Sequence, residues 1–356
     1  MERRSLKEND IATMEQPGIR VVAQSMMAAG KGLLAIDEST GTCDKRFASA
    51  GIARTAEMRR AYRDLLVTAP GLGESISGAI LYDETIRQQT LDGRSFVAAL
   101  NSAGIIPGIK VDMGTVELAG HPAERVTEGL DGLRQRLQDY CAMGARFAKW
   151  RAVLAIGEGL PSTACIEVNA HALGRYAALC QEAGLVPIVE PEVLMDGDHT
   201  LARCAAVTQE VLHRVFDELH LQGVVPEAMI LKPNMVLPGL ACPVQESVQE
   251  VAAATLQCLL RTVPAAVAGI AFLSGGQSGD LASARLNAMH LSAGPDNVRM
   301  PWPLTFSFGR ALQEPALEIW AGKSENRTAA QQALLRRARA NATALRGSEC
   351  GGLDGV

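Results

Sequence analysis

Residues 185–236 contain the pattern that decides the fold: LVPIVEPEV at 185–193, LARCAAVTQEVLHRVFDEL at 201–219 and AMILKPNMV at 228–236. The first and third segments are short apolar runs, as expected of buried strands. In the middle segment, apolar side chains recur at helical spacing, at Val207, Val211, Val215 and Leu219. Strand, helix and strand in this order predict two parallel strands joined by a crossover helix.

Eight such apolar runs occur along the chain, at residues 30–37, 75–85, 104–112, 145–157, 185–193, 228–236, 268–276 and 304–311. Their starts lie 29 to 45 residues apart, which leaves room for a loop and a helix after each strand. Helical periodicity also marks 58–66 and 130–141. The repeat predicts an α/β fold, a (β/α)8 TIM barrel with a parallel eight-stranded core. An open doubly wound sheet is less favoured, since DESTGT after the first run matches no nucleotide-binding turn.

Composition limits the function classes. The 356 residues carry a net charge of −5, so no nucleic-acid partner is expected. No membrane span or secretory signal is visible, which predicts a cytoplasmic protein without a membrane partner. The eight cysteines form no C-x-x-C pair and are expected to be free thiols. We expect a single domain over 1–346, with an N-terminal arm at 1–20 and a flexible tail at 347–356.

Charged residues gather at the ends of the predicted strands. In a barrel of this kind the chemistry lies on that face. Lysine supplies only seven of the 34 basic residues, yet Lys110, Lys149 and Lys232 lie inside apolar runs towards the expected strand ends. The whole set is Asp37, Lys110, Lys149, Arg151, Glu190, Glu192, Lys232 and Arg310. Because buried charges are costly unless they are paired or bind a ligand, we expect the set to converge in one pocket.

These residue types indicate a Schiff-base lyase. A partly desolvated lysine among other cations is expected to have a lowered pKa and to act as a nucleophilic amine. Nearby carboxylates can move the protons that imine formation and carbon–carbon cleavage require. Glycines and Arg310 after the last two runs lie where barrels commonly bind phosphate. The pattern leaves open which of Lys110, Lys149 and Lys232 is the nucleophile.

A metal or other cofactor is not expected. The six histidines include no H-E-x-x-H motif and no pair at a strand end. His199, in DGDHT after the fifth run, is the one histidine near the expected mouth of the barrel.

Several motifs together resemble class I fructose-bisphosphate aldolases. They are GKGLLAIDESTGT, GIKVD, FAKWR, VPIVEPE, DGDH, LKPNM, FLSGGQS and FSFGRAL, in this order between Gly30 and Leu312. The resemblance implies cleavage of fructose 1,6-bisphosphate to dihydroxyacetone phosphate and glyceraldehyde 3-phosphate. It further implies a homotetramer that needs no metal.

The resemblance also implies catalytic roles. Lys232 in LKPNM would be the Schiff-base lysine. Glu190 would be the main general acid and base, with Glu192 beside it. Lys149 would hold charge next to the amine and assist proton transfer, and Asp37 would accept the C4 hydroxyl proton during cleavage.

The phosphorylated ketose would be bound by a second set of residues. One phosphate would lie on Ser274, Gly275, Gly309 and Arg310. The other would lie near Ser39, Thr42 and Lys110. Arg151 would help to bind the sugar, and Lys45 and Arg46 would gate its far end.

Three other functions remain to be weighed. A glycoside hydrolase using Glu190 and Glu192 is disfavoured, because only 4% of residues are aromatic and could stack on a sugar. A related aldolase preferring fructose 1-phosphate or sedoheptulose bisphosphate would share nearly all the motifs. A non-enzymatic scaffold is disfavoured by the complete set of charges.

The tail departs from many eukaryotic relatives, which end in a tyrosine that assists proton transfer. Here the last tyrosine is Tyr176 and the chain ends in LDGV. We therefore expect deletion of residues 347–356 to change the turnover number by less than about threefold, because no proton-transfer group is lost. Steady-state cleavage assays on the two proteins measure this, and a hundredfold drop would show another role for the tail.

Overall fold

The computed structural model describes residues 17–292 and 300–347. Eight parallel strands close into a barrel in the order β1-β10-β9-β8-β7-β6-β3-β2. They are β1 (Gly32–Ala35), β2 (Ile76–Leu81), β3 (Ile106–Lys110), β6 (Phe147–Leu154), β7 (Val186–Val193), β8 (Ile230–Leu231), β9 (Gly269–Phe272) and β10 (Leu304–Phe308). Each lies within one of the eight predicted runs, so the predicted TIM barrel is confirmed.

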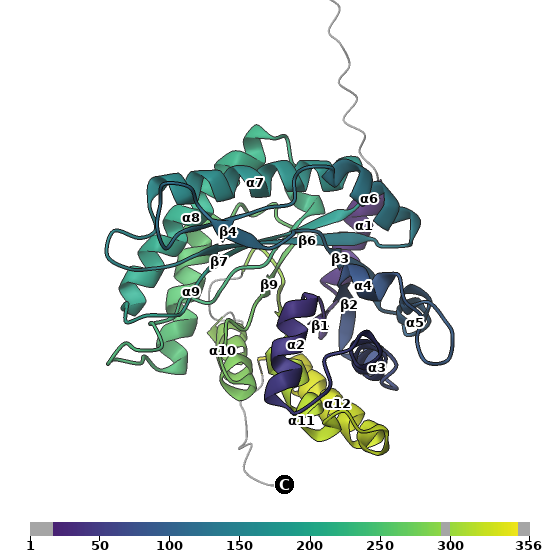
Figure 1. The fold of residues 1–356 in the computed structure, drawn as a ribbon. Helices are drawn as coiled ribbons and strands as arrows, with labels where there is room; N and C mark the ends of the chain where they lie inside the picture. The colour runs from purple at the N-terminus through teal and green to yellow at the C-terminus, as the bar shows by residue number, and fades with distance from the viewer. Residues whose placement is uncertain (1–16, 293–299, 348–356) are drawn as a thin grey trace, which may run out of the picture.

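Helices surround the barrel, as Figure 1 shows. They are α1 (Pro17–Met26), α2 (Thr40–Ser49), α3 (Ala56–Val67), α4 (Asp83–Ile86), α5 (Phe96–Ser102), α6 (Leu133–Ala142), α7 (Thr163–Glu182), α8 (Leu201–Leu221), α9 (Val248–Thr262), α10 (Gly279–Ser292), α11 (Arg310–Trp320) and α12 (Arg327–Ala344). Short 3₁₀ turns occur at Leu72–Glu74, Pro226–Ala228 and Ser324–Asn326. The three segments with helical periodicity became α3, α6 and α8.

The structure differs from the sequence pattern at three places. Helix α6 begins at Leu133 rather than at 130, because Gly132 adopts a left-handed conformation with φ of 66°. Strand β8 ends at Leu231, well before the end of the predicted run at 236. The backbone N–H of Lys232 still donates to Val189 O, but Pro233 has no N–H with which to continue the ladder. An antiparallel hairpin, β4 (Thr115–Glu117) with β5 (Arg125–Thr127), was not predicted. Three-residue strands are too short to show a period.

Side chains alternate along each strand, so every second residue points into the barrel. The lower interior is apolar, with Leu33, Ile80, Phe147, Val186 and Ile230 in one cluster. One layer further along the same strands, the alternation brings charged side chains inward. Lys149 follows Phe147 by two residues, and Lys232 follows Ile230 by two. The barrel thus supports a polar site on an apolar floor.

Helix α1 closes the other end of the barrel. Its Ile19, Ala23 and Met26 are buried in the same apolar cluster as the interior strand residues. Residues 17–20 of the predicted arm therefore belong to a packed helix, and residues 1–16 lie outside the described part of the chain. A barrel floor sealed in this way excludes water from below the charged layer.

The remaining predictions concern the ends of the chain and its thiols. The tail beyond Gly347, including Cys350, lies outside the described residues. The other seven cysteines are free, as predicted. Within 17–292 and 300–347, no helix has both the length and the apolar character needed to cross a bilayer.

The closing role of α1 predicts a stability effect. Met26 is fully buried, whereas Val21 on the same helix is 59% exposed. We expect Met26→Ala to lower the free energy of unfolding by about 2–5 kcal/mol, because it leaves a cavity under the barrel. The matched variant Val21→Ala should change it by less than about 0.5 kcal/mol. Urea denaturation measures both, and equal effects would contradict the packing role of α1.

Candidate active site

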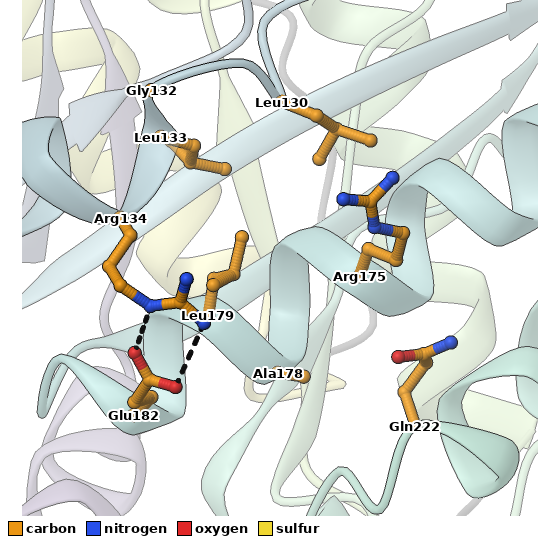
Figure 2. A pocket seen from close by; sticks show the side chains of 9 residues that line it. All are labelled: Leu130, Gly132, Leu133, Arg134, Arg175, Ala178, Leu179, Glu182 and Gln222. Atoms are coloured by element: carbon orange, nitrogen blue, oxygen red, sulfur yellow. Dashed lines mark hydrogen bonds and ion pairs between the residues drawn. The ribbon is translucent and has the colours of Figure 1, made fainter.

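A cavity of about 970 Å³ opens where the barrel strands end. All eight predicted strand-end charges line it, together with residues 274–276 and Gly309. A second cavity of about 370 Å³ lies on the outside, against α6 and α7. Figure 2 shows its Arg134 and Glu182 joined by two hydrogen bonds, and none of the strand-end charges lines it. The larger cavity is therefore the candidate active site.

Glu190 lies between two lysines at the base of the cavity. Its Oε2 is 3.2 Å from Lys149 Nζ, and its Oε1 is 3.2 Å from Lys232 Nζ. Lys149 Nζ also lies 2.7 Å from Asp37 Oδ2. All four side chains are buried. They form a chain of alternating charge, Asp37–Lys149–Glu190–Lys232. Lys149 and Glu190 lie within β6 and β7, and Asp37 and Lys232 lie just beyond β1 and β8.

This alternation sets the charge of the buried groups. Burial raises the pKa of Asp37, but the ammonium groups of Lys149 and Lys232 outweigh it and lower the pKa to about 2. Burial likewise raises the pKa of Glu190, and Lys149, Lys232 and Arg151 bring it below its ordinary value. Both carboxyls are consequently ionised at neutral pH and free to accept a proton.

The expected lowering of a lysine pKa is wrong for Lys149. Burial does lower its pKa, but the charges of Asp37, Glu190 and Asp112 raise it above the ordinary value. Two carboxylates lie within 3.2 Å of this amine, and their charges outweigh the neighbouring cations on which the expectation was based. Lys149 is therefore held as a cation. Within the described part of the chain, Lys232 forms one ion pair, with the Glu190 carboxylate that it shares with Lys149.

Two further ion pairs flank this chain of charges. Lys110 Nζ lies 2.6 Å from Asp112 Oδ1, and Arg151 pairs with Glu192. Asp112 also accepts a hydrogen bond from Arg151 N, which fixes β6 beside it. Glu192 is thus neutralised by an arginine of the neighbouring strand, whereas Glu190 faces the lysines.

One end of the cavity is suited to an oxyanion. Residues 274–276 (Ser-Gly-Gly), which we call the glycine loop, follow β9. Gly275 and Gly276 have φ of 58° and 87°, a left-handed conformation that glycine adopts without strain. A Cβ on Gly276 would lie 3.1 Å from an Arg310 guanidinium nitrogen. Gly309 precedes α11, so unpaired helical N–H groups face the same region.

The opposite end is formed by the start of α2. Ser39 caps this helix by accepting a hydrogen bond from Thr42 N, and both hydroxyls line the cavity. Arg46 lines it too, but its guanidinium is paired with Glu38 and lies 3.3 Å from Gln313 Oε1. Lys45 is exposed on α2 and is not among the lining residues, nor is His199.

The model of the family described as fructose-bisphosphate aldolase class-I matches residues 18–355. The chain belongs to this family. A probable class 1 fructose-bisphosphate aldolase from Xanthomonas campestris pv. campestris is 56% identical over 91% of this chain and 96% of its own length. The cytosolic fructose-bisphosphate aldolase 5 of Arabidopsis thaliana is 52% identical, over 94% and 92%.

A solved structure supports the same relationship. Fructose-bisphosphate aldolase from Plasmodium falciparum, determined in complex with TRAP and a small-molecule inhibitor, superimposes with a TM-score of 0.91. It is 48% identical, and the match covers 94% of this chain and 96% of that one.

The site of this aldolase-family chain contains residues that the sequence reasoning did not select. Asp112 and Ser307 line the cavity, and the buried Ser307 hydroxyl has no hydrogen-bond partner in the described structure. The alternation of side chains along a strand could have revealed both residues. Asp112 lies two positions after Lys110, and Ser307 lies two positions before Gly309, so each shares a strand face with a residue that was selected. Tyr82, Arg87 and Tyr140 also line the cavity. Tyr82 directly follows β2 but carries no charge, and Arg87 and Tyr140 lie at the end of α4 and in α6. The pattern of charges at strand ends therefore gave no signal for any of them.

The lowered pKa of Asp37 predicts a pH-dependent contribution to stability. In the unfolded chain this carboxyl titrates near 3.9, whereas its pKa in the fold is about 2. The folded state binds the proton more weakly. The contribution is therefore fully present above about pH 4 and is lost as the pH falls towards 2.

Thermal unfolding of the wild type and of Asp37→Asn measures this contribution. The asparagine cannot ionise, so the Tm advantage of the wild type should narrow as the pH is lowered from about 5 to about 2. A Tm difference that stays constant over this range would contradict the assignment.

Proposed function

We propose that the protein is a metal-independent, Schiff-base-forming fructose-1,6-bisphosphate aldolase. It would cleave the ketose reversibly to dihydroxyacetone phosphate and glyceraldehyde 3-phosphate. The observation that carries this proposal is the Glu190 carboxylate shared by two buried lysines, in a cavity with cationic groups at its ends. Family membership adds the substrate class.

Lys232 is the proposed nucleophile. Lys149 is held as a cation by two carboxylates, whereas the shared Glu190 is the one ion-pair partner of Lys232 among the described residues. Transfer of one proton from Lys232 Nζ to Glu190 Oε1 leaves a neutral amine beside a neutral carboxylic acid. Lys149 stays neutralised by Asp37 during that transfer. The amine then attacks the C2 carbonyl of the open-chain ketose.

Glu190 is the proposed general acid and base for this step. After the attack it gives its proton to the C2 oxygen and takes one from the amine nitrogen, which leaves a neutral carbinolamine. It then gives this second proton to the C2 hydroxyl, which departs as water while the nitrogen lone pair forms the iminium ion. A carboxyl at 3.2 Å from the reacting amine is within reach for these transfers. Lys149 lowers the cost of negative charge on Glu190, and Glu192, paired with Arg151, keeps Arg151 at the substrate.

Asp37 is the proposed base for cleavage. Its carboxylate takes the C4 hydroxyl proton, and the electrons of the C3–C4 bond pass to the iminium nitrogen. An aldehyde forms at C4 and leaves, and an enamine remains on Lys232. Protonation of the enamine at C3, followed by hydrolysis, releases the ketone and restores the amine.

The two phosphates would occupy the two ends of the cavity. One would bind the glycine loop, Gly309 and Arg310. The other would bind near Ser39, Thr42 and Lys110, with Lys45 and Arg46 at its outer edge. With both phosphates of the ketose bound, its C2 atom would lie against Lys232 and its C4 atom against Asp37. The binding energy of the phosphates would thus hold the reacting carbons in the required orientation.

We further propose a cytoplasmic homotetramer acting in glycolysis or in the reverse synthesis. The family resemblance supports the assembly, and the names of the cytosolic plant relatives support the location.

Borohydride trapping tests the mechanism. The full chain is incubated with dihydroxyacetone phosphate in EDTA, reduced with borohydride, and mapped by mass spectrometry. We expect a stable adduct on Lys232. Lys232→Met should abolish the adduct and reduce cleavage of fructose 1,6-bisphosphate by at least about a thousandfold, since the amine that forms the proposed iminium is lost.

Lys323→Met is the matched control, because it removes an exposed lysine outside the cavity. It should keep both the adduct and the activity. An adduct on Lys149 or Lys110 would retain the mechanism and correct the residue. Activity that is lost in EDTA, with no adduct, would overturn the proposal.

A further inference from the structure

Among the residues that the structure describes, Arg285 on α10 is a buried cation without an acidic partner. Only 4% of its surface is exposed, and among the described residues no carboxylate forms an ion pair with it. Its Nε is buried and finds no hydrogen-bond acceptor in the described part of the chain. By contrast Arg63, equally buried, pairs with Glu38 at 2.7 Å. Burial alone lowers the pKa of Arg285, and an arginine remains charged nonetheless.

One side chain connects Arg285 to the glycine loop. Arg285 Nη1 donates to Gln277 Oε1 at 2.7 Å. The amide of Gln277 donates in turn to Ser274 O at 2.9 Å and lies 3.6 Å from Met235 Sδ. Ser274 O also accepts the backbone N–H of Gln277. The guanidinium is therefore two hydrogen bonds away from the first residue of the loop, on the side facing the protein interior.

This arrangement has an electrostatic consequence. A buried charge is screened much less than an exposed one, so the guanidinium contributes positive potential across the loop. No carboxylate within 17–292 or 300–347 compensates that charge in the unliganded protein, which costs stability. A phosphate dianion on the opposite face of the loop would compensate it.

We propose that Arg285 is a positioning residue for the glycine loop, holding it through Gln277 and supplying from behind the positive charge that favours a bound phosphate. The inference rests on the proposed function only in naming the substrate phosphate as the anion. Arg285 does not line the cavity, so it acts on binding and not on the reacting atoms.

Thermal unfolding with inorganic phosphate as the probe tests the charge. Arg285→Met removes the buried cation at similar length. In phosphate-free buffer we expect its Tm to equal or exceed that of the wild type, because an uncompensated charge is lost. Addition of phosphate should raise the Tm of the wild type, and the variant should show at most half of that increase.

Two comparison variants sharpen the test. Arg214→Met makes the same change in net charge at an exposed arginine paired with Glu167, and should respond to phosphate as the wild type does. Arg285→Lys keeps a buried cation that can reach Gln277, and should recover most of the phosphate response. If Arg285→Met fails to fold, Arg285→Gln replaces it as the neutral variant.

Kinetics separates positioning from a merely structural role. With fructose 1,6-bisphosphate, Arg285→Met should raise KM roughly five- to tenfold and change kcat by less than about twofold, because the interaction is lost equally in bound substrate and transition state. Gln277→Met should raise KM by a similar factor. Because Arg285 and Gln277 are proposed to act as a unit, the KM of the double variant should not exceed that of either single variant.

The contrary outcomes are distinct. A lower Tm with an unchanged phosphate response would show that Arg285 is only structural and would overturn the inference. So would a wild type whose Tm does not respond to phosphate. Borohydride trapping on the wild type tests the proposed function separately. If Lys232 forms the adduct but phosphate raises the Tm of Arg285→Met as much as that of the wild type, the inference about Arg285 fails and the proposed function stands.

Discussion

A carboxylate at the centre of the barrel lies 3.2 Å from two lysine ammonium groups, and the rest of the site depends on this contact. Removing four charged side chains from water is tolerable only if their charges compensate one another. The order Asp37–Lys149–Glu190–Lys232 achieves this, since each interior member has a neighbour of opposite charge on both sides. The same order allows a proton to move between Lys232 and Glu190 while Lys149 and Asp37 stay paired. Stability and chemistry therefore impose the same arrangement.

The barrel makes the arrangement possible through its period of two. Phe147 and Ile230 fill the lower layer, and Lys149 and Lys232 occupy the next inward positions on the same strands. Helix α1 seals the floor with Met26 and its neighbours. The charged layer is thus rigid and open on one side only, and the ligand enters from the mouth. The four members come from four strands, so neither their spacing nor their pairing exists before the barrel closes.

The glycine-loop end of the cavity follows a different electrostatic principle. There, no carboxylate among the described residues pairs with the cationic groups: Arg310 lies over Gly276, and Arg285 lies behind the glycine loop. Charge compensation is complete at the centre, where protons move, and incomplete at this end, where an anionic group would bind. This division lets binding energy at the periphery orient a substrate whose reacting carbons lie at the centre.

The sequence by itself determined the barrel, because eight apolar runs with helices between them are compatible with few other folds. It also showed that charged residues cluster towards the ends of these runs, where side chains two residues apart share one face. It also supplied the family through LKPNM and VPIVEPE. It did not determine which lysine stays charged, since that depends on Asp37 and Glu190, which approach Lys149 from other strands. Nor did it reveal the seal made by α1, Ser307 in the cavity, or the link from Arg285 to the glycine loop. Each of these is a contact between segments distant in sequence, and only the closed tertiary structure brings such segments together.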